Sequence, residues 1–353
     1  MIHKSDLLSQ DLSKTLSVCN LICTVLIISI HFNTKQHINL SDGFTINYYL
    51  QEFITNSLAR VAVPFFAFTS GFFFFRRFSF TINSYKSLIN KRFVSLFIPY
   101  VLGASLVLIA ELFYGRMIDF ESTTAREVLV AIFVKPLSVQ FWFVRDLILL
   151  TLISPIIYFL LTKLCWVFVL FCMISWLLDF EPAPLWGGRS LVTIEVGAFF
   201  VLGAYLYKKR TWLEKFITTT PLIPLILTGL LLATWRIYTD PTMSNWYHNY
   251  YTQSSLLIQN IYILITILSV LVISNRLRHE HKLIWLSKFT FFVYLYHLLP
   301  LSRVVVKVSD YVVSDPYKFY VTFPMSVIFT FIVAILFSKY NKKLYNIFNG
   351  GRH

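Results

Sequence analysis

The chain has 353 residues, of which 57% are hydrophobic, 18% are aromatic and 14% are charged, and its mean hydropathy is +0.66. This composition is too apolar for a soluble domain and indicates a membrane protein with several spanning segments. The net charge of +14 does not indicate a nucleic-acid partner, because the basic residues lie in short clusters between apolar runs, where they face anionic lipid.

The four cysteines lie inside apolar segments, where we expect them to pack as small apolar residues. Their positions give neither the disulfide framework of a secreted domain nor the spacing of a metal site, so we expect no metal cofactor. The four are Cys19, Cys23, Cys165 and Cys172.

Apolar runs of about 17 to 22 residues, the length that crosses a bilayer core as a helix, recur along the whole chain. They predict an all-α fold: a polytopic helical bundle of about ten transmembrane helices. We expect one membrane domain, 1–353, with no internal repeat and no soluble appendage. The expected spans lie near 16–32, 57–75, 93–114, 141–162, 164–179, 190–207, 217–236, 255–274, 283–301 and 319–338.

The distribution of Lys and Arg predicts the orientation of this bundle. Ten is an even number, so both termini lie on one side of the membrane. If that side is cytoplasmic, the inner segments hold 19 Lys and Arg and the outer segments hold 8. Because positive residues accumulate on the cytoplasmic side of membrane proteins, this asymmetry predicts that both termini are cytoplasmic.

Several ionisable residues fall inside or at the ends of the expected spans, and this orientation gathers them in the outer half of the membrane. Charged residues at helix ends can extend to the interface, and for Glu111 and Arg236 this explanation and a functional one both stay open. Other intramembrane ionisable groups tend to face a cavity, so the sequence favours a polar site that opens outward. The remaining members of the group are His31, Arg60, Arg145, Asp146, Glu195 and His297.

Three stretches narrow the location of this site. In the second expected span, Pro64 interrupts the helix and Gly71 allows close backbone approach, which membranes tolerate only beside a cavity or packed protein. Trp142 opens the fourth span, either as an interfacial anchor or as a residue that stacks on a ligand. In the ninth span, Tyr294 and His297 lie three residues apart on one helical face, and His297 is either a packing residue or part of the site.

These residues together resemble the acyltransferase-3 family, integral-membrane enzymes that O-acetylate bacterial surface polysaccharides. The likeness covers nearly the whole chain and rests on the order and spacing of motifs that are individually unspecific. They are the first apolar run ending in His31, Arg60-Val61-x-Val63-Pro64 with Ser70-Gly71-Phe72, the Trp142-Phe143 helix with Ser154-Pro155, and Tyr294-Leu295-Tyr296-His297.

The resemblance implies a bacterial inner-membrane O-acyltransferase with an essential histidine in its first span. It implies acetyl-CoA as the cytoplasmic donor, and a surface polysaccharide or a lipid-linked sugar as the acceptor. Two positions depart from the family pattern. Cys19 and Asn20 stand where an arginine is common, and Ser95 lies three residues after Arg92, where a paired-arginine motif is often found. Donor binding is therefore open to other basic residues.

Acyl transfer to a sugar hydroxyl needs a base that takes the proton and a cation that holds the developing oxyanion. Histidine suits the first role near neutral pH, so His31 is the expected general base, with Asp146 as the group that orients it. Arg145 or Arg60 is the candidate oxyanion partner, and His297 is a further candidate of the site. A covalent acyl-histidine is an open alternative.

A basic segment between the second and third expected spans is the candidate donor site. Residues 76–92 contain five positive side chains and no acidic one, and the phosphates of coenzyme A would meet them from the cytoplasmic side. Binding of lipid headgroups is the alternative explanation of the same cluster. The candidate donor-binding residues are Arg76, Arg77, Lys91 and Arg92, together with Ser70.

A transporter or flippase for a lipid-linked glycan is the main alternative function. Such a protein would also have about ten spans and interrupted helices, but transporters typically contain two repeated halves, and none is visible here. A purely structural membrane protein would explain the apolar packing but not the gathering of ionisable residues at one depth.

The loop 237–254, which contains no Lys or Arg, is predicted to face the outside. A single cysteine placed at Asn245, in a variant without the four native cysteines, should react with a membrane-impermeant maleimide added to intact cells. Reaction only after the reagent has crossed the membrane would reverse the orientation.

Overall fold

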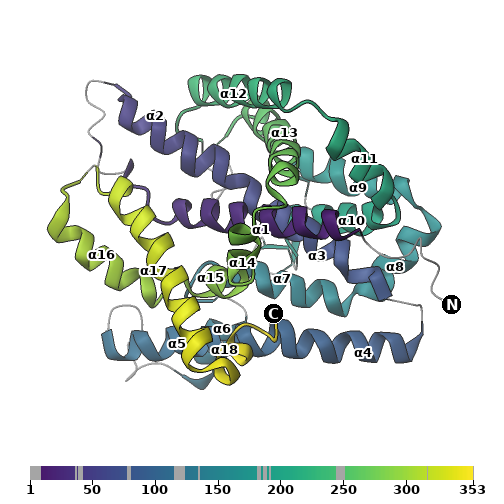
Figure 1. Cartoon of the computed structure of the whole chain (residues 1–353), viewed down its shortest axis with the longest axis horizontal. Helices are drawn as coiled ribbons and strands as arrows, with labels where there is room; N and C mark the ends of the chain where they lie inside the picture. Colours follow the sequence, from purple (N-terminus) through teal and green to yellow (C-terminus); the bar gives the residue numbers. More distant parts are fainter. Residues whose placement is uncertain are drawn as a thin grey trace. The chain divides into compact units, whose positions relative to one another are not determined.

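Over the residues that it describes, a computed structural model is all-α apart from one pair of two-residue strands (Figure 1). The strands Pro184–Leu185 (β1) and Arg189–Ser190 (β2) pair in antiparallel fashion. The all-α fold class predicted from the sequence is confirmed. The structure describes residues 9–35, 38, 43–77, 81–114, 124–133, 136–180, 184–185, 189–190, 192–243, 251–315 and 317–352.

The helices group into two compact units, and each unit is made of two separate stretches of chain. Unit 1 comprises Met1–Arg77 and Ile157–Lys288, and unit 2 comprises Phe78–Ile156 and Phe289–His353. Neither unit can therefore fold from one contiguous segment.

Unit 1 begins with α1 (Gln10–Ile30), which the Ser9 side chain caps by accepting from the Leu12 N–H at 3.1 Å. The second span follows as α2 (Ile46–Glu52), a π-helical segment (Phe53–Ser57), a 3-10 turn (Leu58–Val61) and α3 (Ala62–Phe74). The interruption predicted at Pro64 thus lies before the proline, which sits in the first turn of α3. The second span ends in a short 3-10 turn, Phe75–Arg77. The chain returns to unit 1 through α8 (Ser154–Lys163). The other helices of unit 1 are α9 (Trp166–Leu177), α10 (Ile194–Lys208), α11 (Arg210–Thr219), α12 (Leu222–Thr239), α13 (Gln253–Leu277) and α14 (His281–Ser287).

Two glycines bring α3 and α10 into backbone contact. A Cβ added to Gly71 of α3 would lie 1.9 Å from the Phe200 carbonyl oxygen, and a Cβ added to Gly203 of α10 would lie 2.0 Å from the Phe68 carbonyl oxygen. Small residues allow such close approach between helices in a membrane, where van der Waals packing drives association. The close approach predicted at Gly71 is confirmed, and α10 is its partner.

Unit 2 begins with α4 (Ile82–Arg92), which continues through a π-helical segment (Phe93–Phe97) into α5 (Ile98–Tyr114). Near the end of the chain, α18 (Lys342–Phe348) packs beside α5 (Figure 1). The other helices of this unit are α6 (Ala125–Phe133), α7 (Phe141–Leu152), α15 (Thr290–Tyr296), α16 (Leu301–Val312) and α17 (Phe319–Tyr340).

Within the described part of the chain, six helices are long and apolar enough to cross a membrane, and up to eight spans result if each of two bent pairs counts as one. The bends measure 66° between α7 and α8 and 72° between α15 and α16. The expected count of ten and the orientation of the termini stay predictions. The six helices are Gln10–Ile30, Ile46–Phe74, Ile82–Glu111, Leu222–Thr239, Gln253–Leu277 and Phe319–Tyr340.

The largest differences from the expected spans occur at prolines and at short apolar runs. Pro155 and Pro300 lie at the two bends, where proline removes a helical hydrogen bond, so 283–301 is not one straight helix. The expected spans 164–179 and 190–207 appear as α9 and α10, which have 12 and 15 residues.

Substitution Gly203→Ala should destabilise unit 1, because the added methyl group would overlap the backbone of α3 and force the two helices apart. Overpacking of this kind typically costs about 1–3 kcal/mol. Thermal unfolding of the purified protein in detergent measures the effect. Gly197→Ala on the same helix is the matched control, since its Cβ would meet only the Val192 side chain at 3.9 Å. Equal unfolding midpoints for the two variants would contradict the packing described here.

Candidate active site

A buried cluster of polar side chains lies in unit 1, where the second span is irregular. We call it the Glu52 network; it consists of Lys35, Glu52, Asn56, Ser57 and Arg236. The side chain of Glu52 is 1% exposed and that of Arg236 is 0% exposed. Buried charges persist only where counter-charges and hydrogen bonds replace water, so the contacts of these two groups organise the cluster.

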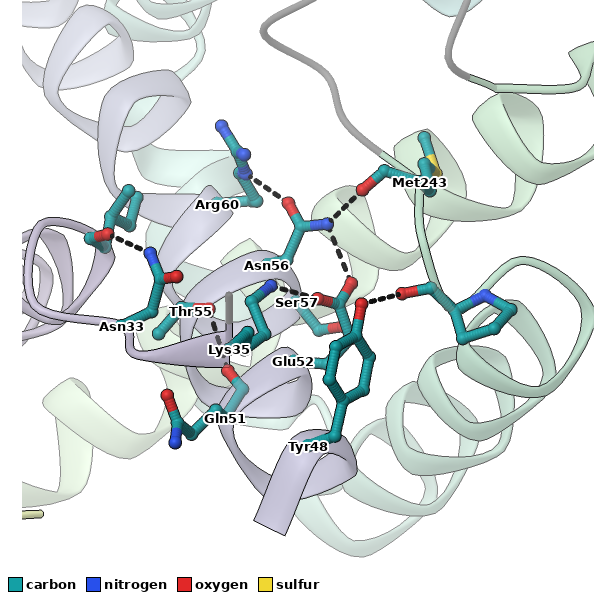
Figure 2. Close-up of polar contacts among 12 residues, drawn as sticks. Asn33, Lys35, Tyr48, Gln51, Glu52, Thr55, Asn56, Ser57, Arg60 and Met243 are labelled. Atoms are coloured by element: carbon teal, nitrogen blue, oxygen red, sulfur yellow. Dashed lines mark hydrogen bonds and ion pairs between the residues drawn. The ribbon is translucent and has the colours of Figure 1, made fainter. Parts of the chain in front are cut away.

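The Arg236 guanidinium, from α12, is held by three oxygen atoms of the second span. Its Nη1 donates to Glu52 Oε1 at 2.5 Å, while Nη2 donates to Ser57 Oγ at 2.6 Å and to the Asn56 carbonyl oxygen at 3.2 Å. The ammonium group of Lys35 pairs with the other carboxylate oxygen of Glu52 (Figure 2). Glu52 thus lies between two cations and ties α12 to the second span.

Asn56 connects the network to Arg60 (Figure 2). Its Nδ2 donates to Glu52 Oε1 and to the Met243 carbonyl oxygen, both at 2.7 Å, and its Oδ1 accepts from Arg60 Nε at 2.8 Å. The Nε2 of Gln259, on α13, donates to the Asn56 carbonyl oxygen at 2.9 Å. Because an amide donates and accepts at once, Asn56 fixes Arg60 relative to Glu52.

The local backbone explains why these groups meet. Glu52, Asn56 and Arg60 are spaced four residues apart, which places them on one side of a helix. The π-helical segment lies between the first and the last of them, and such segments often occur at functional sites because the wide turn re-aims side chains and carbonyl groups.

His31 stands at the C-terminal end of α1 and is partly exposed. The chain that follows it is fastened to α2: the Thr34 N–H donates to Gln51 Oε1 at 2.8 Å, and Lys35 pairs with Glu52. The helix α1 also packs against the π-helical segment and the 3-10 turn. His31 therefore lies at the end of a helix that packs on the irregular part of the second span.

Arg60 is the other predicted site residue of unit 1 that the structure joins to this cluster. Its Nε donates to Asn56 Oδ1, and Asn56 in turn donates to Glu52. Glu195 lies in the first turn of α10. The sequence gathered Arg60 and Glu195 in the outer half of the membrane, and in the structure both residues belong to unit 1.

Arg145 and Asp146 lie in unit 2, on α7, and interact with each other. Arg145 Nη2 and Nε donate to Asp146 Oδ1 at 3.0 and 3.2 Å, and the Asp146 side chain is 0% exposed. Because His31 belongs to unit 1, its expected orientation by Asp146 stays a prediction.

His297 is buried in unit 2 at the end of α15. Its Nδ1 lies 2.8 Å from the Tyr294 carbonyl oxygen and 3.2 Å from that of Val293. Carbonyl oxygens only accept, so Nδ1 carries the proton and Nε2 has the lone pair in the neutral ring. The Tyr294 hydroxyl donates to the Gln140 carbonyl oxygen at 2.8 Å, so α15 is also tied to the start of α7. These bonds fix the Tyr294 and His297 side chains within unit 2, and a role of His297 in the site stays a prediction.

Glu111 and Arg236, for which the sequence left two explanations open, are not charges that extend to an interface. Arg236 is the buried centre of the Glu52 network, and Glu111 is 0% exposed and pairs with Arg303 of α16. Hydropathy cannot distinguish a charged residue that reaches the interface from one that is buried against a partner. Both appear in the sequence as a charged residue at the end of an apolar run.

The candidate donor-binding residues are distributed over both units. Ser70 is partly buried on α3, and Arg76 is exposed in the following 3-10 turn; the Arg77 side chain lies outside the described residues. Lys91 is exposed and Arg92 is partly buried at the end of α4. Lys91 and Arg92 lie side by side on one helix of unit 2, whereas Ser70 and Arg76 belong to unit 1.

Sequence reasoning missed Glu52, Asn56 and Lys35, because they fall in a stretch that hydropathy assigns to an external loop. The spacing of Glu52, Asn56 and Arg60 was the available signal. Lys35 had no local signal, since its partner is 17 residues away.

Among the described residues, no group of three or more His, Cys, Asp or Glu side chains could hold a metal ion. A family model described as an acyltransferase domain matches residues 17–339 of the chain. The search of curated proteins and the search of solved structures returned no significant match. The matched residues include His31, Arg60 and the whole Glu52 network.

Glu52→Gln should destabilise the protein strongly, because it leaves the buried Arg236 guanidinium without its carboxylate. Loss of one partner of a buried ion pair typically costs about 3–5 kcal/mol. The unfolding midpoint in detergent measures this. Asp310→Asn serves as control: Asp310 is 49% exposed in its pair with Lys318, and exposed pairs contribute only about 0–1 kcal/mol. An unchanged midpoint for the Glu52 variant would refute the role given to the network.

Proposed function

This chain belongs to the acyltransferase-3 family, and we propose that it moves an acetyl group from cytoplasmic acetyl-CoA to a hydroxyl of a cell-surface glycan or of its lipid-linked precursor. The family match over residues 17–339 is the observation that carries the reaction class. The long apolar helices support a multi-pass membrane location, which we propose to be the bacterial inner membrane.

His31 is the proposed general base. Its imidazole takes the proton of the acceptor hydroxyl while the hydroxyl oxygen attacks the thioester carbonyl carbon of the donor. The tetrahedral intermediate then collapses, the carbon–sulfur bond breaks, and the leaving thiolate of coenzyme A takes the proton back from His31. Partial exposure at the end of α1 supports this role, because the ring is then within reach of a substrate.

Arg60 is the proposed oxyanion partner in the same unit. A preorganised guanidinium stabilises the charge that develops on the thioester oxygen without having to reorient during the reaction. The bond from Arg60 Nε to Asn56 Oδ1 supports this role, since it fixes the side chain through the Glu52 network. Arg145 with Asp146, and His297, are the proposed contributions of unit 2.

The donor is proposed to bind through its phosphates to basic side chains at the cytoplasmic side, with Arg92 as the principal contact. Arg92 ends α4, immediately before the π-helical segment that leads into α5. Arg76, Arg77, Lys91 and Ser70 are the other proposed contacts.

Transfer of labelled acetyl groups distinguishes this function from its alternatives. The purified protein in lipid is incubated with labelled acetyl-CoA and a surface glycan, and label on the glycan supports the enzyme. Movement of glycan across the bilayer without acylation would instead identify a transporter or flippase, which also uses interrupted helices. Label retained on the protein when the acceptor is left out identifies a covalent acyl-histidine.

His31→Ala should lower acyl transfer by about 10² to 10⁴, the usual contribution of a general base, with unchanged membrane level and unfolding midpoint. His297→Ala should have the smaller effect on rate. His281→Ala, at an exposed position of α14, is the matched control and should be fully active. Near-normal product formation by the His31 variant would remove it from the mechanism.

A further inference from the structure

A short amphipathic helix of unit 1, α11, lies next to the start of a candidate membrane span. It ends at Thr219, and α12, one of the six long apolar helices, begins only three positions later at Leu222. A spanning helix starts near the membrane surface, so this separation keeps α11 close to that surface. In the predicted orientation this is the cytoplasmic surface.

One face of α11 is fixed inside unit 1. Leu213 and Ile217 are buried, and the helix packs against α13. Glu214, the acidic residue of this helix, accepts from Ser9 Oγ at 2.5 Å, which ties α11 to the residue that caps α1. These contacts determine which side of α11 stays exposed.

The exposed side of α11 carries a stacked aromatic pair beside a lysine. The ring centroids of Trp212 and Phe216 are 5.3 Å apart, and Trp212 is 55% exposed. Lys215 is exposed and shares their face, because helical positions three and four residues apart lie on one side. Tryptophan is enriched where a membrane meets water, since its ring is apolar and its N–H is polar.

Three further cations stand immediately before this aromatic pair. Lys208 and Lys209 are exposed where α10 ends, and Arg210 opens α11. The segment 208–216 thus contains four basic side chains and one acidic side chain, and the acidic one, Glu214, is bonded inside unit 1. The charge of this surface is therefore positive, which complements the anionic headgroups of a membrane leaflet.

We propose that this part of unit 1 is a binding site for anionic phospholipids, with the lysines and the arginine on the headgroup phosphates and the aromatic pair between the lipid chains. We call it the α11 surface; it consists of Lys208, Lys209, Arg210, Trp212, Lys215 and Phe216. The proposal is independent of the acyl-transfer reaction. A general excess of positive charge would orient the chain without any aromatic residue, and a soluble phosphate compound would need only the cations. Exposed rings beside the cations fit a ligand that has both a phosphate and acyl chains.

Protection of the full chain against thermal unfolding in detergent, measured with added dioctanoyl phosphatidylglycerol, tests the proposal. The triple variant Lys208→Gln, Lys209→Gln, Lys215→Gln should need at least ten-fold more lipid for half-maximal protection. Each basic side chain near an anionic surface contributes about five-fold to binding. The protection that remains should depend less on salt. Trp212→Ala should weaken protection without changing its salt dependence, and Trp212→Phe should restore most of it.

A second triple variant with the same loss of charge is the control. Lys307→Gln, Lys342→Gln, Lys343→Gln changes exposed positions of unit 2, and this variant should be protected like the wild type. Wild-type protection of the Lys208 triple variant overturns the proposal, and so does equal protection of the wild type by dioctanoyl phosphatidylcholine. Glycerol 3-phosphate has the phosphate but no acyl chain, so equal protection by it would identify a site for soluble phosphate compounds and overturn the lipid assignment.

Hydrogen exchange of the wild type decides the question if the Lys208 triple variant does not fold. Replacing part of the phosphatidylcholine in nanodiscs by phosphatidylglycerol should slow exchange of the backbone amides of residues 210–219. Unchanged exchange in this segment overturns the proposal.

Discussion

The buried guanidinium of Arg236 imposes the strongest constraint on unit 1. A full positive charge with no exposed surface requires a carboxylate, and Glu52 supplies it at 2.5 Å. Because Glu52 also binds Lys35 and Asn56, one carboxylate fixes the loop after His31, the irregular second span and α12. The chemistry proposed for His31 and Arg60 thus depends on an ion pair in which neither residue takes part.

The fold class could be predicted because each membrane helix is recognised from the composition and length of its own apolar run, without knowledge of its neighbours. The all-α membrane fold and the close approach at Gly71 are confirmed, since both follow from local sequence. The helix boundaries could not be predicted equally well. Hydropathy starts the second span near residue 57, but the helix begins at Ile46, because Gln51 and Glu52 are polar residues that are buried by pairing rather than by transfer into lipid.

Residues of the candidate site could be predicted only where an ionisable side chain stands in an apolar stretch of the sequence. His31 and Arg60 stand out as ionisable groups in apolar surroundings, whereas Glu52 appears in the sequence as an ordinary loop carboxylate. The pairing of Arg236 with Glu52 was equally hidden, because it joins residues 184 apart in the chain. Contacts of that range depend on how complete helices pack, which no local pattern encodes.

The carbonyl group of Asn56 accepts hydrogen bonds from Arg236 and Gln259, in addition to the bonds made by the Asn56 side chain. A substitution at this position replaces the side-chain amide. It leaves the main-chain carbonyl group in place, since every residue carries a main-chain carbonyl. A scan of single substitutions would therefore detect only the hydrogen bonds that the Asn56 side chain makes. The hydrogen bonds to its main-chain carbonyl group would instead be disturbed by an insertion or deletion in the π-helical segment, because one residue more or less rotates the following part of the helix by about 100°.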